Sequence, residues 1–291
     1  MEFRKLDESK VLKDPVHSYI HINYEVVWQC IDSKEFQRLR RIRQLGGDFQ
    51  VYPTAEHSRF SHSLGVYEIV RRMVTEIKSL SNELSEYDKV SVMLAGLLHD
   101  VGHGPFSHAF EHVTNHSHED YTVKIILGDT ELNSVLSKVS KNLPHDIVAI
   151  IQHTHKNDIL NQIVSGQLDA DRMDYLLRDS YFTATSYGQF DLERILRTMR
   201  VRKIDDDKKQ LVVKYTGIHS VEDYIMARYQ MYWQVYYHPV ARSYETVFIQ
   251  LFKRLNDIFK VNKDYFSDIK VLVPFLEKSE VTVEEYFRLD E

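Results

Sequence analysis

The sequence predicts an all-α fold, a helical bundle with a small β-ribbon and a hairpin added. Apolar residues recur at intervals of three and four along most of the chain, which is the spacing of helices with one buried face. The 291 residues include only ten glycines and six prolines, about half the usual share, and this argues against a turn-rich β protein. The chain is also long enough to bury a sizeable core.

Two short segments are predicted to form the β structure. Residues 10–22 alternate apolar and polar side chains, which is typical of a half-buried ribbon. Residues 201–215 contain two β-prone runs around a charged turn. We expect this second segment to form a hairpin that projects from the bundle.

The helices are predicted from their apolar faces. Residues 34–44, 62–80 and 88–100 each carry such a face, and Asp88 is the expected N-cap of the third. Further helices are expected at 118–127, 144–154, 158–165, 171–181, 191–199, 220–237 and 243–260. The final thirty residues are too weakly patterned to assign.

The chain is expected to form one domain. No repeat, low-complexity tract or flexible linker interrupts it, so residues 1–254 are predicted to be the domain and residues 255–291 a short extension of it. Every apolar run is broken by a charge within about a dozen residues, far short of the roughly twenty that cross a membrane. The N-terminus lacks the apolar stretch of a secretory signal, so we expect a cytoplasmic protein without a membrane partner.

Charge and cysteine content exclude other classes. Lys and Arg number 37 against 43 Asp and Glu, a formal net charge of −6. Non-specific nucleic-acid affinity comes from excess cationic charge, so nucleic acid is not an expected partner. The single cysteine, Cys30, allows neither an internal disulfide nor a cysteine-rich zinc site. Any metal must therefore be held by histidines and carboxylates.

Histidines gather in one part of the chain, with eight of the fifteen between residues 57 and 118. This region contains the motif LLHDVGHGPFSH, in which an apolar helix ends at His99 and Asp100. Two polar groups beside a core need partners. A divalent cation would satisfy both. The alternative is a His–Asp hydrogen bond at a helix end, which is the more common fate of an isolated pair.

Two other motifs supply further candidate ligands. RFSHSLGV puts His62 at a helix start, and LDADRMDYLLRD puts Asp171 in an apolar helix. The alternative for Asp171 is a surface salt bridge, because Asp174 and Arg178 nearby form an ordinary i,i+4 pair. Ligands from three helices would hold a cation rigidly and leave one face open. The predicted ligand set is His62, His99, Asp100 and Asp171.

With these motifs, the sequence resembles the HD-domain metal phosphohydrolases. It is most similar to their deoxynucleoside triphosphate triphosphohydrolases, of the SAM-and-HD-domain and bacterial dGTPase-like kind. The resemblance covers about residues 10–254 and lies in the ordered stretches FQRLRRIRQLGG, RFSHSLGV, HDVGHGPFSH, HE and DADRMDYLLRD. It implies an HD-type helical domain that binds nucleotides and hydrolyses a deoxynucleoside triphosphate (dNTP) to a deoxynucleoside and inorganic triphosphate.

The resemblance also implies roles for individual residues. It makes the four candidate ligands a site for Fe, Mn, Mg, Zn, Co or Ni. The residues expected in catalysis are His103, His108, Glu111 and His118. The departing oxygen needs a proton donor, for which imidazole is best tuned. Either His108 or His118 could be that donor, and Glu111 would orient one of the histidines.

The expected substrate-binding residues fall into three groups. The resemblance assigns phosphate contacts to arginines, the sugar 3′-hydroxyl to an amide and a carboxylate, and the sugar ring to tyrosines, of which Tyr236 would reject a 2′-hydroxyl. The full set is Gln44, Leu45, Arg59, Arg172, Tyr175, Asp179, Arg228 and Tyr236.

Regulation and assembly are also implied by the resemblance. A homo-oligomer, a dimer or a tetramer, is expected. In regulated members a guanine nucleotide, GTP or dGTP, activates the enzyme at a subunit contact. The matching positions here are Lys10, Val11, Asp32, Gln37 and Arg40. Gln37 and Arg40 equally fit an ordinary exposed helix face, and longer relatives complete their regulatory sites with a C-terminal lobe, so regulation stays open.

Three functions remain open from the sequence. The first is dNTP triphosphohydrolysis. The second keeps the metal site but acts on another phosphoester, such as a nucleoside monophosphate, a cyclic dinucleotide or a nucleic-acid end. The third is a nucleotide sensor without turnover, which has no need of a proton donor beside a metal. The phosphate product distinguishes the first two.

Overall fold

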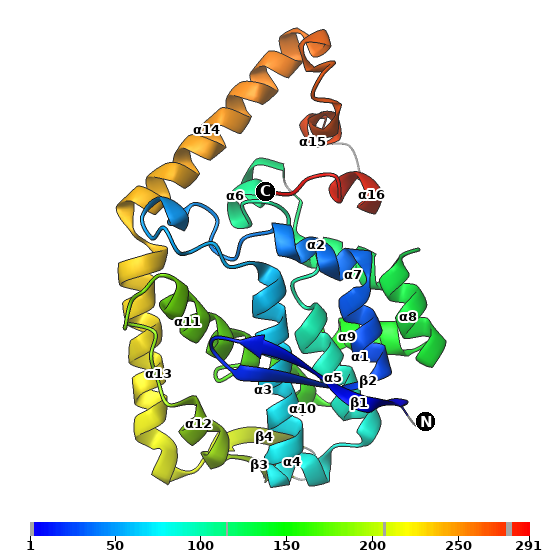
Figure 1. The fold of residues 1–291 in the computed structure, drawn as a ribbon, viewed down its shortest axis with the longest axis vertical. Coiled ribbons are helices and arrows are strands. Elements are labelled where there is room, and N and C mark those ends of the chain that lie inside the picture. The colour runs from blue at the N-terminus through cyan, green and yellow to red at the C-terminus, as the bar shows by residue number, and fades with distance from the viewer. Residues whose placement is uncertain (1–2, 115, 206–207, 278–280) are drawn as a thin grey trace.

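The structure, a computed structural model, describes residues 3–114, 116–205, 208–277 and 281–291, with the side chains of all of these except residues 108, 205 and 208. Helices dominate this part of the chain, and its β-strands form two antiparallel two-stranded sheets (Figure 1). The predicted all-α class with small β additions is therefore confirmed.

The elements follow one another in chain order. The first sheet pairs β1 (Lys5–Asp14) with β2 (Ser18–Tyr24), and the second pairs β3 (Met199–Asp205) with β4 (Lys208–Val213). The helices before β3 are α1 (Glu25–Asp32), α2 (Lys34–Arg38), α3 (Arg59–Glu76), α4 (Lys78–Glu83), α5 (Glu86–Leu98), α6 (His108–Thr114), α7 (His118–Leu127), α8 (Glu131–Val139), α9 (Leu143–Ile151), α10 (Asp158–Val164), α11 (Ala170–Phe182) and α12 (Leu192–Thr198). After β4 come α13 (Ile218–Met231), a π-helical turn (Tyr232–Tyr236), α14 (Pro239–Val261), α15 (Val273–Leu276) and α16 (Val283–Tyr286).

Helices α3 and α5 form the centre of the core and lie side by side (Figure 1). They approach closely at Gly96, where an added Cβ would lie 2.9 Å from a methyl group of Val70. Both helices are buried on almost every side, and helix α11 packs against α3. The core therefore fixes the ends of three helices, and these ends carry the polar motifs.

Most predicted elements are confirmed to within a few residues, including both β segments and α7. The helix predicted over residues 34–44 is wrong in length, because it ends at Arg38 and continues only as a 3-10 turn. The segment 62–80 is two helices, α3 and α4. The N-cap of α5 is Ser85, whose hydroxyl accepts from the Asp88 backbone N–H while the Asp88 carboxylate accepts from the Ser85 N–H. Asp88 is thus the partner in a capping box.

Helices α1, α6 and α8 were not predicted. Each has nine residues or fewer, and helices this short are stabilised mainly by tertiary packing. The last residues also return to the body of the fold after the long helix α14 (Figure 1). There, the Glu291 backbone N–H donates to the Arg41 carbonyl at 3.0 Å, and Arg38 Nη2 donates to the Leu289 carbonyl at 2.9 Å.

The boundary predicted at residue 254 lies within α14. None of the helices that the structure describes combines the length and the apolar character needed to cross a membrane.

Candidate active site

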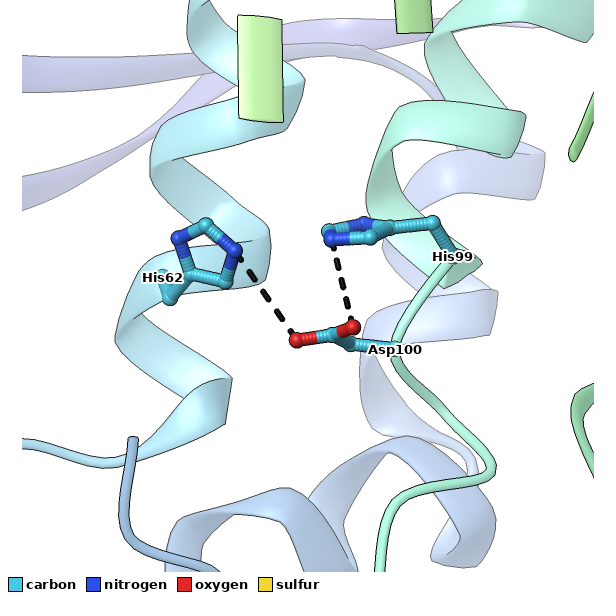
Figure 2. A group of neighbouring side chains, drawn as sticks. All are labelled: His62, His99 and Asp100. Carbon is cyan, nitrogen blue, oxygen red and sulfur yellow. Dashed lines mark ion pairs between the residues drawn. The ribbon is translucent and has the colours of Figure 1, made fainter. Parts of the chain in front are cut away.

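Four polar side chains from three helices meet at one point. His62 lies in the first turn of α3, His99 and Asp100 at the C-terminal end of α5, and Asp171 in the first turn of α11. Figure 2 shows His62 facing His99 and Asp100 from the neighbouring helix. The Nε2 atom of His62 is 3.0 Å from Asp171 Oδ1 and 3.8 Å from Asp100 Oδ2. The Nε2 atom of His99 is 3.4 Å from Asp100 Oδ1 and 3.5 Å from Asp171 Oδ1. The structure therefore brings all four predicted ligands together.

This cluster fits a divalent cation. Ligand atoms of His62, His99 and Asp100 all lie within 4.8 Å of one another. The buried Nε2 atom of His99 has no hydrogen-bond partner among the described residues, whereas its Nδ1 lies 2.9 Å from the Gly96 carbonyl. A cation bound in the cluster would accept the lone pair of this buried nitrogen. Two imidazoles with two carboxylates suit first-row transition metals.

A buried chain of charges orients His62. Its Nδ1 lies 2.7 Å from Asp174 Oδ2. Asp174 accepts from Arg178 Nε at 2.8 Å and lies 2.6 Å from His17 Nε2, and Arg178 also donates to Asp14 at 2.8 Å. Because Asp174 occupies the Nδ1 side, the Nε2 atom of His62 faces the cluster. Such outer partners of ligating histidines fix both the tautomer and the ring orientation.

The charges in this chain shift pKa values strongly. Burial alone would raise the pKa of Asp174, but Arg178 and its histidine partners hold it well below its usual range. Burial lowers the pKa of His62, yet hydrogen bonds to Asp171 and Asp174 raise it to about 10. A cation that binds here would replace the proton on His62.

Little in the sequence indicated this chain of charges. Asp174 and Arg178 looked like an ordinary helical pair, and Asp14 belongs to the β-ribbon. One usable signal was Gly65, a glycine inside a buried helix. An added Cβ there would lie 1.9 Å from Asp174 Oδ1 and 2.4 Å from Arg178 Nη2. Only glycine leaves room for these buried charged side chains to lie this close to the α3 backbone.

A second cluster lies beside the first and contains His103, Glu111 and His118. The Glu111 carboxylate is hydrogen-bonded to His118 Nδ1 and accepts from its backbone N–H at 2.7 Å. The His103 ring stacks on the His118 ring with centroids 3.8 Å apart, and His103 Nε2 lies 3.3 Å from Asp100 Oδ1. Glu111 therefore orients His118. The side chain of His108, the other predicted proton donor, lies outside the described part.

The neighbouring residues His103 and Asp100, one from each cluster, differ in their protonation. Burial lowers the pKa of His103 well below its usual value, and the nearby Arg59 charge lowers it further. The pKa of Asp100, which burial would raise, is held well below its usual range by His99, Arg59 and His103. A neutral imidazole and an ionised carboxylate therefore stand side by side near pH 7.

One cavity of about 430 Å³ opens over both clusters. Its wall combines predicted residues with a glycine-containing loop and with aromatic side chains of the π-helical turn and α14. The predicted residues in the wall are Gln44, Leu45, Arg59, His62, Asp100, His103, His118, Asp171, Tyr175, Asp179 and Tyr236. Wall residues that were not predicted include Asp48, Phe106, Tyr232, Tyr244, Glu245 and Phe248.

The three predicted phosphate-binding arginines are placed differently. Arg59 is buried in the wall, where its Nη1 lies 2.5 Å from Asp100 Oδ2 and its Nη2 donates to Ser107 Oγ at 2.7 Å. Among the described residues, the wall includes neither Arg172 nor Arg228. The guanidinium of Arg172 is held by Asp169, at 2.9 Å, and by a backbone carbonyl. Arg228 lies over the ring of Tyr232 at 5.7 Å.

The predicted activator residues lie apart from the cavity wall. Lys10 and Val11 are exposed on β1, and Asp32 is exposed at the end of α1. Gln37 accepts from Arg40 Nε at 2.8 Å. The Arg40 guanidinium also lies 3.6 Å from the ring centre of Phe60. Nothing in these contacts tests nucleotide binding, so the activator site stays a prediction.

Comparison with known proteins identifies the family. The HD domain family matches residues 59–179, which contain all four candidate ligands, and the HD associated region matches residues 190–291. A solved phosphohydrolase from Bacteroides thetaiotaomicron is 31% identical, with a TM-score of 0.82 over 97% of this chain and 70% of that one. The chain belongs to the HD-domain phosphohydrolases, in the group similar to the deoxynucleoside triphosphate triphosphohydrolases, as its motifs predict.

Two curated relatives illustrate this group. The uncharacterized protein YwfO of Bacillus subtilis is 51% identical over 99% of this chain. The deoxynucleoside triphosphate triphosphohydrolase SAMHD1 homolog of Dictyostelium discoideum is 31% identical over 94% of this chain. The chain spans 65% of the length of the first relative and 54% of the second.

Proposed function

We propose that the protein hydrolyses dNTPs to deoxynucleosides and inorganic triphosphate, with a divalent cation held by His62, His99, Asp100 and Asp171. The observation that carries this proposal is the cavity over the two clusters, because it joins them to a wall of polar and aromatic side chains that can contact a sugar. A triphosphate fits against the clusters, and the deoxyribose fits against Tyr175, Asp179 and Tyr236. The relative named as a dNTP triphosphohydrolase supports the same substrate.

The clusters suit attack at the α-phosphorus. When bound, a divalent cation supplies a Lewis acid and makes hydroxide available near neutral pH. The bond between the α-phosphorus and the 5′-oxygen breaks, and His118 delivers the proton that this oxygen needs. Glu111 keeps the His118 ring in position. His103 and Arg59 donate hydrogen bonds to the triphosphate.

The sugar end of the cavity supports selection of deoxyribose. The rings of Tyr175 and Tyr236 meet edge to face, with centroids 6.1 Å apart. Burial and the neighbouring Asp179 charge raise the pKa of Tyr236 well above its usual value, so its hydroxyl stays protonated. The Tyr236 side chain then forms a fixed wall against a 2′-hydroxyl. An apolar wall alone rejects an added hydroxyl by only about a hundredfold, so stronger selectivity for deoxyribose needs a steric contact such as this one.

Product analysis tests the proposal. The purified protein is incubated with each dNTP and with Mn²⁺, Fe²⁺, Mg²⁺, Zn²⁺, Co²⁺ or Ni²⁺, with and without GTP. We expect deoxynucleoside and intact triphosphate with at least one cation. Release of orthophosphate or of a nucleoside monophosphate would support the alternative, a phosphatase or phosphodiesterase of the same family. Absence of turnover under all these conditions would contradict an enzymatic function.

A further inference from the structure

The carboxylate of Asp179 is held from two sides in the cavity wall. Its Oδ1 lies 2.7 Å from His57 Nε2, and its Oδ2 accepts from the Tyr236 hydroxyl at 2.8 Å. Asp179 is only 1% exposed, yet it is part of the cavity wall. Two partners on opposite oxygens fix the plane of the carboxylate. Each oxygen keeps a lone pair for one further donor.

His57 is itself fixed by packing. It is 5% exposed, and its ring stacks on Phe182 with centroids 4.6 Å apart and an interplanar angle of 11°. Its Nδ1 has no hydrogen-bond partner among the described residues. The only polar contact described for this ring is therefore the one to Asp179, which makes Nε2 the nitrogen that carries the hydrogen.

His57 also contacts another residue of the cavity wall through its backbone. The carbonyl of His57 accepts from the backbone N–H of Gln44 at 2.9 Å, and Gln44 is part of the cavity wall. His57 thus connects the two residues, Gln44 and Asp179, that are expected to contact a sugar hydroxyl. It does so from behind the wall, because His57 is not among the described lining residues.

We infer that His57 is a positioning residue, which aims the Asp179 carboxylate at the 3′-hydroxyl of the bound deoxyribose. This inference rests on the proposed function, since it names the group of a bound dNTP that the cavity wall contacts. A fixed carboxylate accepts a strong hydrogen bond from a hydroxyl, whereas a carboxylate free to turn accepts a weaker one. Loss of the His57 donor therefore lowers the preference for a sugar that carries this hydroxyl.

The test compares a dNTP with its 2′,3′-dideoxy analogue, which lacks the hydroxyl. For the wild type we expect kcat/KM to be about ten- to a hundredfold higher for the dNTP, the range for one hydrogen bond to a charged group. In His57→Leu this ratio should fall severalfold, mainly through slower dNTP turnover, because only Tyr236 still holds the Asp179 carboxylate. In His57→Gln, whose amide nitrogen reaches nearly as far as Nε2, most of the ratio should return.

Further measurements distinguish the loss of a positioning contact from damage to the fold. Thermal unfolding and bound-metal content are measured for each variant. If His57→Leu does not fold, His57→Asn replaces it, because the shorter amide keeps polarity but does not reach Asp179. A His57→Leu or His57→Asn protein that folds and keeps the wild-type ratio would overturn the inference while leaving the proposed function intact. A wild type that releases no triphosphate from any dNTP would instead overturn the proposed function, and the inference with it.

Discussion

The Nδ1 atom of His62 and the Oδ2 atom of Asp174 lie 2.7 Å apart. The two side chains come from different helices, and both are buried. This contact decides which nitrogen of His62 faces the other ligands. It also connects the candidate metal centre to Arg178 and, through it, to Asp14 of the β-ribbon. We therefore expect the affinity for a cation to depend on residues that do not contact it.

Asp174→Asn should weaken cation binding by about 10- to 100-fold, the usual effect of losing an outer partner of a ligating histidine. The amide keeps the shape of the side chain but not the charge that orients His62. Competition with a chromophoric chelator measures the affinity. The same exchange at Asp257, which is exposed on α14, is the matched control. Equal affinities for wild type and Asp174→Asn would contradict the orienting role.

His99→Ala should remove both bound metal and turnover, because it deletes one of the two imidazoles of the candidate metal centre. Elemental analysis after dialysis gives the metal content, and triphosphate release gives the activity. His219→Ala is the control, since its side chain is 90% exposed. Retention of stoichiometric metal by His99→Ala would remove His99 from the ligand set.

His118→Gln should lower kcat by about 10²- to 10⁴-fold, the range for loss of a general acid, with little change in KM. Steady-state kinetics separate the two constants. His108→Gln, measured in parallel, decides which of the two predicted donors acts, and His112→Gln on the exposed side of α6 is the control. If His118→Gln turns over as fast as the wild type, His118 is not the proton donor.

Asp48→Asn should stabilise the protein increasingly as the pH rises from 5 to 8. Burial, with the charges of Asp179 and Glu245, raises the pKa of Asp48 from 3.8 to about 7. Between these values the folded protein binds more protons than the unfolded chain, so the wild type loses stability as the pH rises. The asparagine removes this loss, which amounts to at most about 4 kcal/mol above pH 7.

Thermal unfolding at several pH values checks this expectation. The melting temperature of Asp48→Asn should exceed that of the wild type by several degrees at pH 8 and by much less at pH 5. A difference that does not change with pH would show that the Asp48 carboxyl does not titrate in this range.

Much of the fold was predictable because a helix with one buried face leaves a local pattern of apolar residues in the sequence. Apolar spacing located α7 and α11, and the adjacency of His99 and Asp100 at the end of an apolar helix marked a polar site beside the core. Short helices such as α8 were missed, because their stability comes from neighbours that the local pattern does not contain. Helix ends also depended on caps, as with Ser85 in α5.

The sequence by itself predicted the class of fold, the family and the four residues that converge beside the core, since each prediction rests on residue types within short motifs. Only the tertiary structure decided how the site is held. It paired His57 with Asp179 and Asp14 with Arg178, and it built part of the cavity wall from α14. These pairings join segments up to 164 residues apart in the chain. A local periodicity in the sequence does not indicate which distant side chains the packing of the core will bring together.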